Sequence, residues 1–324
     1  MVKSGLLAGA LLYSVAAIAN TTSLTSQVTA LWQSGDYQAA RQLLADKVSK
    51  KTKDAELLAL LGQTEALLSN NEQAEQWLEK AVKFDDNHAD YQHWYATVSC
   101  KLASSASMFS ALGYAKRCKK AYETALELAP ENPRSYIALG SFLAQAPAIA
   151  GGDKDEALQL AEKLKQLDET QGWLLQLKVA DIADDAAFDQ FLAGAELLKA
   201  RPEPYFQRAM QLASQENYIA AITLLQQAIQ QTAVDDEAKA SRNESHYQLA
   251  RCAVLGKTAV TEGIAAMQYY LQENPASERY DWAQLRLAQL YLLANSTEKA
   301  KAITEPLLAS TSDDKLKAEL KKLL

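Results

Sequence analysis

The sequence predicts an all-α protein, a solenoid of stacked helical hairpins, on three observations. The chain has 324 residues, which is long for one globular core but natural for an array that grows along one dimension. Gly (12) and Pro (7) are scarce while Ala, Leu, Gln, Glu and Lys are abundant, which is a helix-forming composition. The stretch 55–88 has the pattern of two short amphipathic helices joined by a polar turn, and this pattern recurs along the chain.

The unit 55–88 shows the recurring pattern most clearly. Apolar and small residues mark its two helices: Leu58, Leu61, Gly62, Ala74, Leu78 and Ala81. The small residues Gly62 and Ala74, on either side of a turn at 69–71, predict a close crossing of the two helices. The unit resembles the tetratricopeptide repeat, a motif of about 34 residues. The resemblance implies a right-handed superhelical solenoid. One such hairpin cannot bury its apolar faces alone, so neighbouring hairpins must stack on it.

The flanking units follow the same pattern with two departures. The first unit is partial and carries its matches over 31–44. The third unit, 89–132, has 44 residues, which is ten more than the repeat needs. The extra length predicts longer helices around a turn at 109–113.

A loop with Pro and Gly interrupts the fourth unit. Pro147 should end the first helix because its ring blocks the preceding turn, and Gly151 and Gly152 permit positive φ. Asp153 has the position of an N-cap, with Glu156 completing a capping box. The Gly-Gly-Asp triplet lacks the Lys-Ser/Thr of a phosphate loop and the spaced carboxylates of a calcium loop, so it is expected to be structural. Together with the long third hairpin, this loop resembles a group of exported bacterial repeat proteins, a resemblance that implies no activity.

Four further units and a terminal helix complete the predicted array. The fifth unit is degenerate and the next three are clear: 174–202, 205–228, 247–275 and 287–307. The segment 232–244 is polar and acidic, which fits either a loop or an extension of the next helix. A last helix over 313–324 pairs leucines with lysines and is expected to cap the final apolar face.

The N-terminal residues have the features of a secretory signal peptide. Lys3 precedes an apolar run over 5–17, and small residues precede Asn20, so cleavage is expected after Ala19. The alternative is a membrane anchor, but a run of about fifteen residues falls short of the ~20 needed to span a bilayer. The predicted boundaries are a signal peptide at 1–19, the repeat array at 20–314 and a C-terminal capping helix at 315–324. The product is expected to be periplasmic or secreted, with no further membrane segment.

The charge pattern predicts no nucleic-acid partner, and the polar residues predict no metal site or catalytic site. The formal net charge of −7 is spread along the chain without a basic stripe, so nucleic acid is not an expected partner. His88 and His93 are five positions apart, which does not place them on one helical face as metal ligands. No serine lies in a nucleophile-elbow pattern, and no cofactor is predicted. The chain is therefore not expected to be an enzyme, although a carboxylate pair assembled by the fold stays an alternative.

Cys100 and Cys118 lie on opposite arms of the third hairpin. An exported protein enters an oxidising compartment, where disulfides persist. Against a bond, Cys118 occupies a small-residue site that faces the partner helix, whereas Cys100 lies off the apolar face. Free cysteine is often simply a small buried residue. A disulfide and a reduced pair are both open, and Cys252 would stay unpaired.

The resemblance to the tetratricopeptide repeat also implies a binding groove, because first helices line a concave surface in that family. The matching positions form a partly apolar strip: Ile137, Leu175, Val179, Phe206, Met210 and Leu285. Such a surface suits an amphipathic helix or an extended peptide. The alternative is that these side chains pack against neighbouring first helices.

The expected function is that of an exported scaffold that binds another protein in the cell envelope through this groove. A small-ligand or glycan-binding envelope protein is the first alternative. An enzyme with a fold-assembled carboxylate site is the second. The sequence predicts neither the identity of the partner nor the oligomeric state.

Overall fold

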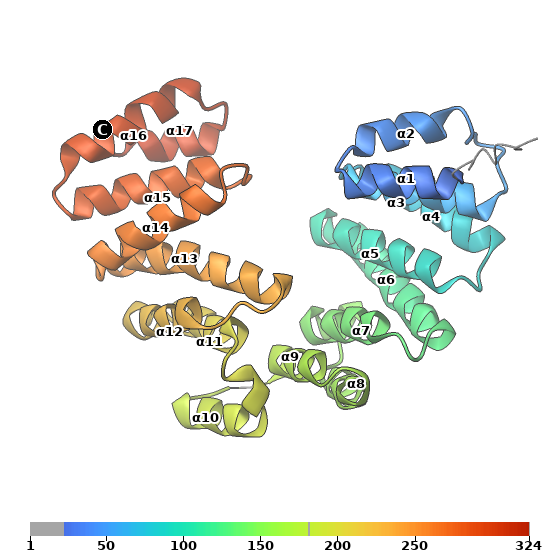
Figure 1. Cartoon of the computed structure of the whole chain (residues 1–324), viewed down its shortest axis with the longest axis horizontal. Helices are drawn as coiled ribbons and strands as arrows, with labels where there is room; N and C mark the ends of the chain where they lie inside the picture. The colour runs from blue at the N-terminus through green and yellow to red at the C-terminus, as the bar shows by residue number, and fades with distance from the viewer. Residues whose placement is uncertain (1–22, 181, 324) are drawn as a thin grey trace, which may run out of the picture. The chain divides into compact units, whose positions relative to one another are not determined.

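The computed structural model describes residues 23–180 and 182–323, and within these ranges the chain is helical, with no strands (Figure 1). It divides into two compact units, Met1–Ala129 and Pro130–Leu324. The predicted signal peptide and its cleavage site lie outside the described residues. Among the described helices, none has the length and hydropathy that a bilayer crossing requires.

The described part of the first unit, residues 23–129, forms three helical hairpins. They are formed by α1 (Leu24–Gln33) with α2 (Tyr37–Ala45), α3 (Ala55–Leu67) with α4 (Asn71–Phe84), and α5 (Ala89–Ser105) with α6 (Met108–Leu128). Side-chain hydrogen bonds join the first hairpin to the second. Trp32 Nε1 donates to Thr64 Oγ1 at 3.1 Å, and Arg41 Nε donates to the buried Glu65 carboxylate at 2.8 Å.

The close crossing predicted for α3 and α4 is confirmed. Gly62, Ala74 and Leu78 are all buried. A Cβ atom added to Gly62 would lie 2.6 Å from Leu78 Cγ and 3.2 Å from the carbonyl oxygen of Ala74. A side chain at this position therefore has no room, because real Cβ contacts are not that short.

The third hairpin has the predicted long helices, but the predicted turn position is wrong. The helices are separated at Ala106 and Ser107, and residues 109–113 lie inside α6. Gly113 suggested the turn, yet a glycine inside a helix costs only about 1 kcal/mol. The packing of α6 on α5 through buried residues such as Ala115 and Tyr122 outweighs that cost.

The second unit contains five further hairpins and a terminal helix. In chain order these are α7 (Pro133–Gln145), α8 (Lys154–Leu167), α9 (Glu169–Val179), α10 (Asp185–Gly194), α11 (Pro202–Ser214), α12 (Tyr218–Gln230), α13 (Asp236–Gly256), α14 (Val260–Glu273), α15 (Tyr280–Leu293), α16 (Thr297–Ser310) and α17 (Asp314–Lys321). Short 3-10 turns lie at Ala148–Ala150 and Glu196–Leu198. A cluster of buried residues from α11 to α15 forms the main core of this unit.

The helix stop, the positive φ at Gly151 and the cap at Asp153 that were predicted for the α7–α8 connection are confirmed. Gly152 does not have a positive φ, and the backbone N–H of Asp153 donates to the carbonyl oxygen of Leu143. The helix α7 ends two residues before Pro147, and Gly151 has a φ of 98°. Asp153 caps α8, because its Oδ1 accepts from the backbone N–H of Glu156 at 3.0 Å. The loop is thus accounted for by its own backbone geometry.

Two open points of the C-terminal half are also decided. Helix α13 begins at Asp236, so most of the acidic segment 232–244 extends this helix rather than forming a loop. Asp235 caps the helix by accepting from Ala238 N at 2.8 Å. At the end of the array, α17 places Leu316 and Leu320 in one buried cluster with residues of α15 and α16.

Candidate partner-binding groove

The first helices of three consecutive hairpins line a hollow of about 500 Å³ in the second unit. Its apolar residues come from α9, α11 and α13: Leu174, Leu177, Phe206, Met210 and Ala240. Phe206 and Met210 are partly exposed, and they pack on the edge of the main core. We call this hollow the groove.

The repeat length explains which side chains enter the groove. The lining residues of α13 follow those of α11 at a spacing of 34 positions, as with Phe206 and Ala240 or Met210 and Glu244. The lining residues of α9 precede those of α11 by only 29 positions, as with Leu177 and Phe206. The degenerate fifth unit is therefore five positions shorter than the sixth. The predicted groove residues Leu175 and Phe206 are 31 positions apart, which does not match this spacing of 29.

Two of the six predicted groove residues line the hollow, and four do not. Phe206 and Met210 are the two that lie in it. Leu175 and Val179 are 1% and 7% exposed and are not lining residues. A shift of one position turns a helical side chain by about 100°. Leu174 and Lys178 therefore face the groove, while Leu175 packs against Gly140, where an added Cβ would lie 2.5 Å from it.

Leu285 is not a groove residue either. It is fully buried in a cluster with Leu307, Leu316 and Leu320. The terminal helix α17 covers this end of α15, so no partner can contact Leu285 without displacing α17. For Leu175, Val179 and Leu285, the alternative of packing against neighbouring helices is thus the correct one.

The sixth predicted residue, Ile137, lies on α7 and is partly exposed. Ser141 follows it by one helical turn and accepts a hydrogen bond from Lys178 Nζ at 3.3 Å. Because residues four apart share one helix face, Ile137 lies on the face of α7 that Lys178 reaches. It is outside the hollow itself.

Hydrogen bonds between the first helices fix the walls of the groove. Gln207 Nε2 donates to the carbonyl oxygen of Leu177 at 2.6 Å, which joins α11 to α9. Gln171 Nε2 donates to Glu237 Oε2 at 2.9 Å, which joins α9 to α13. The groove is therefore largely preformed, and a ligand need not organise it.

A buried arginine supports the lip of the groove between α11 and α13. Arg201, with a side chain 7% exposed, donates to both oxygens of Glu203 at 2.6 and 3.2 Å. It also donates to both oxygens of Asp235 at 2.7 and 3.0 Å. Burial alone would lower the pKa of Arg201, but the hydrogen bonds to Asp235 and Glu203 raise it further than burial lowers it. The same contact lowers the pKa of Asp235.

The opposite end of the groove carries a second ion pair. Arg279 Nη1 donates to both oxygens of Glu244 at 2.9 and 3.1 Å, and Gln248 Nε2 donates to the same carboxylate at 2.9 Å. The charge of Glu244 raises the pKa of Arg279. Each of the three lining glutamates thus has a partner in the protein, Glu237 through Gln171. The groove has an apolar floor and polar walls, a combination that is typical of ligand-binding sites.

No group of metal-ligating side chains is found among the described residues. His246 is the most perturbed histidine, and burial, aided by Arg242, lowers its pKa to about 4. It stacks on Tyr269 with the ring centroids 4.1 Å apart, and Tyr269 belongs to α14 rather than to the groove. His93 contacts Tyr122 within the first unit.

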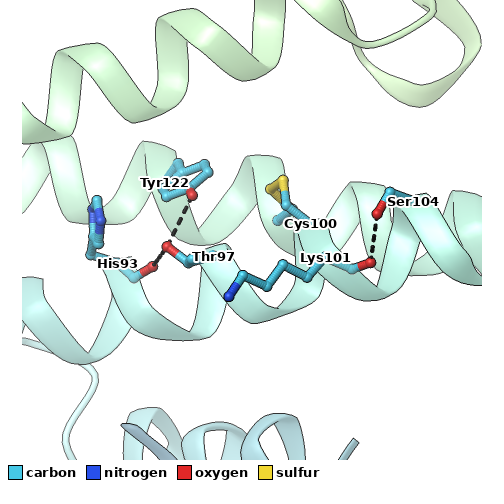
Figure 2. The surroundings of a disulfide bond; sticks show 7 residues. His93, Thr97, Cys100, Lys101, Ser104 and Tyr122 are labelled. Atoms are coloured by element: carbon cyan, nitrogen blue, oxygen red, sulfur yellow. Dashed lines mark hydrogen bonds between the residues drawn. A yellow bond between two sulfur atoms is a disulfide. The ribbon is translucent and has the colours of Figure 1, made fainter. Parts of the chain in front are cut away.

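The structure joins Cys100 and Cys118 by a disulfide, with the Cα atoms 5.3 Å apart. Figure 2 shows Cys100 on α5 beside the polar contacts of Thr97, whose hydroxyl lies 3.0 Å from that of Tyr122. The bond is possible because Cys118 faces α5 and Cys100 is partly buried. Cys252 is free and buried.

Sequence reasoning missed several lining residues: Leu174, Leu177, Lys178, Glu203, Glu237, Ala240 and Glu244. The repeat spacing could have identified some of them, because Glu203 and Glu237 are 34 positions apart, which is one repeat length. The prediction began the seventh unit at Tyr247, whereas α13 begins 11 residues earlier, so Glu237 was not assigned to a first helix.

Comparison with solved structures identifies the fold. The yeast protein Tom70 matches 89% of this chain with a TM-score of 0.58 and 16% sequence identity. The fold is that of the tetratricopeptide-repeat proteins. The chain spans 57% of the Tom70 chain.

Further repeat proteins show weaker likeness. A tetratricopeptide repeat protein from Parabacteroides merdae has a TM-score of 0.48 and 13% identity over 93% of this chain and 97% of its own. The type IV pilus biogenesis factor PilW has a TM-score of 0.47 and 13% identity over 83% of this chain and 97% of its own. Residues 24–150 match the family RMD1-3, described as regulator of microtubule dynamics protein 1-3. A comparison with curated proteins found no match.

Proposed function

We propose that this protein is an exported scaffold that binds another polypeptide through the groove of α9, α11 and α13. The observation that carries the proposal is the hollow of about 500 Å³ with partly exposed Phe206 and Met210 on its floor. In a repeat solenoid, a preformed apolar surface on the first helices is a site where a partner polypeptide can bind. The tetratricopeptide-repeat fold supports a role in protein interaction rather than in catalysis.

The guest fits best as an amphipathic helix or an extended segment with one or two large apolar anchors. Aromatic and Met side chains supply much of the energy at such sites, which makes Phe206 and Met210 the expected hot spots. The walls carry Lys178 at one end and the paired Glu244 at the other. These charges are rim groups, and they set the orientation of the guest more than its affinity.

A small-molecule ligand is the second candidate. The volume of about 500 Å³ lies within the range of roughly 300–1,000 Å³ that small-ligand sites occupy. A glycan would need donors and acceptors on the floor, whereas the floor consists of Leu174, Leu177, Phe206, Met210 and Ala240. The apolar floor favours the polypeptide.

The exported location is part of the proposal and rests on residues 1–19. A basic start, an apolar run and the site before Asn20 support cleavage and release into the periplasm or the medium. The disulfide in the structure agrees with an oxidising compartment. N-terminal sequencing of the mature product should begin at Asn20, and an intact Met1 would reject export by this route.

Site-specific photo-crosslinking tests the groove directly. A benzophenone amino acid at the exposed Glu237, on the polar wall of the groove, should give a discrete protein adduct in the native host. The matched control is the same amino acid at Ile219, which is 71% exposed on α12 and does not line the groove. The same adduct pattern at both positions, or none at Glu237, would reject the groove as the binding site.

A further inference from the structure

The α5–α6 hairpin of the first unit extends further at its turn than the neighbouring α3–α4 hairpin. Ala74 on α4 and Cys118 on α6 are both fully buried and occupy the same place in their repeats. Helix α4 begins three residues before Ala74, whereas α6 begins ten residues before Cys118. The difference of seven residues is two helical turns, or about 10 Å.

The extension, residues 102–115, is uncharged and ends on two exposed apolar side chains. Met108 is 79% exposed and Phe109 is 91% exposed, the highest values among the large apolar side chains of the described residues. No Asp, Glu, Lys, Arg or His occurs between 102 and 115. Ser104 and Ser105 donate their hydroxyl protons to the carbonyl oxygen of Lys101 at 2.8 and 3.2 Å, as Figure 2 shows for Ser104. This uncharged segment is called the tip below.

Basic residues surround the base of the tip and form a collar. The collar consists of Lys101, Lys116, Arg117, Lys119 and Lys120. No Asp or Glu occurs between positions 100 and 120, although the whole chain has a net charge of −7. The three exposed members are Lys101, Lys116 and Lys120. Arg117 and Lys119 have acidic partners, Glu75 at 3.2 Å and Glu123 at 3.7 Å.

The Cys100–Cys118 disulfide braces the hairpin at the level of the collar. Cys100 is next to Lys101, and Cys118 lies between Arg117 and Lys119. The bond therefore holds the two arms together where the extension begins and leaves the tip beyond it. A braced, protruding tip loses little conformational freedom on contact with a surface.

We propose that this tip docks the protein onto the surface of an anionic phospholipid bilayer. Apolar groups of peripheral proteins enter a membrane by about 5–10 Å, which matches the length of the uncharged extension. At that depth the exposed lysines of the collar lie among the anionic headgroups, each contributing to attraction that salt screens. The charge pattern favours lipid over protein, because an uncharged apex above three exposed lysines, Lys101, Lys116 and Lys120, complements a flat anionic layer.

Vesicle binding by the purified full-length mature protein tests the proposal. Unilamellar vesicles of phosphatidylcholine with 30% phosphatidylglycerol, against phosphatidylcholine alone, are the probes. We expect sedimentation with the anionic vesicles at low salt, and release when the salt concentration is raised. The double variant M108S/F109S should bind the anionic vesicles at least tenfold more weakly, and K101Q/K116Q/K120Q should lose the preference for anionic lipid.

Matched controls separate docking from general effects. I219S removes an apolar side chain that is 71% exposed on the other unit, and K154Q/K163Q/K301Q removes three exposed lysines there. Both controls should bind as the parent protein does. Thermal melts of all variants should coincide, because every substituted side chain is exposed.

Three outcomes would overturn the proposal. Failure of the parent protein to bind anionic vesicles is the first. Equal binding by M108S/F109S and the parent protein is the second. Loss of a protein partner by the tip variants without any change in vesicle binding is the third, and it would make the tip a protein interface.

Discussion

Phe206 of α11 and Ala240 of α13 stand 34 positions apart and line the same hollow. One repeat length thus separates a large apolar side chain from a small one at equivalent places on neighbouring first helices. The small side chain leaves space beside the large one, and the groove exists because of this difference. A side chain as large as Phe at position 240 should fill the hollow.

The α3–α4 crossing should not accept a larger side chain. Ala74 is fully buried and its carbonyl oxygen would lie 3.2 Å from a Cβ on Gly62, so Ala74→Leu should destabilise the protein by about 1–3 kcal/mol through overpacking. The control Gln76→Leu changes an exposed residue of the same helix and should change the free energy of unfolding by less than about 0.5 kcal/mol. Urea denaturation measures both, and equal effects would contradict the assigned crossing.

Loss of the disulfide should destabilise the long hairpin. Cys100 and Cys118 are 18 positions apart, and closing a loop of that length stabilises a fold by about 3 kcal/mol in the chain-entropy account. The double variant Cys100→Ser/Cys118→Ser should therefore melt earlier than the parent protein. A reductant should lower the melting temperature of the parent protein and leave that of the variant unchanged; the same shift in both would assign the effect to something other than this bond.

Arg201 should be required for stability, unlike a surface lysine nearby. Arg201→Met leaves the buried Glu203 and the capping Asp235 without their cation, and breaking such a pair costs about 3–5 kcal/mol. Lys239→Met removes only an exposed pair with Asp236 and should cost less than about 1 kcal/mol. Chemical denaturation at pH 7 compares the two variants.

The pH dependence of the Arg201 site gives an independent check. Arg201 lowers the pKa of Asp235, so this carboxylate stabilises the fold above its ordinary pKa, and the stabilisation is lost as pH falls through the lowered value. The parent protein should thus lose more stability on acidification than Arg201→Met does. Parallel curves below pH 4 would contradict the assigned pair.

Because of His246, the free energy of unfolding should decrease as the pH falls from neutral to mildly acidic. Burial lowers its pKa to about 4, and its Nδ1 is buried without a hydrogen-bond partner. Because the unfolded chain binds a proton near pH 6.5 while the folded one does not, stability is full above 6.5 and is lost as pH falls toward 4. His246→Phe keeps a ring on Tyr269 and should show a smaller loss between pH 7.5 and 5.0 in urea titrations.

The fold could be predicted well from the sequence because the same pattern of two amphipathic helices and a turn recurs along the chain. Small residues at Gly62 and Ala74 and the cap at Asp153 act locally, so their patterns are sufficient. The groove was predicted only in part. Phe206 and Met210 lie where the unit length is regular. Leu175 and Val179 lie before a shortened unit, one position after the lining residues Leu174 and Lys178, and one position turns a helical side chain by about 100°. Leu285 was misplaced because the cover provided by α17 is a tertiary contact without a local signal.

The affinity of the groove for its partner tests the central proposal most directly. With the partner captured through a crosslinker at Glu237 and then purified, the dissociation constants of the parent protein and of Phe206→Ala/Met210→Ala should be measured side by side. We expect the double variant to bind at least tenfold more weakly, about 1.4 kcal/mol, while Ile219→Ala binds as the parent does. The melting temperature should change little, because Phe206 and Met210 are only partly buried. Unchanged affinity, or weakening that accompanies a large fall in melting temperature, would contradict the proposal.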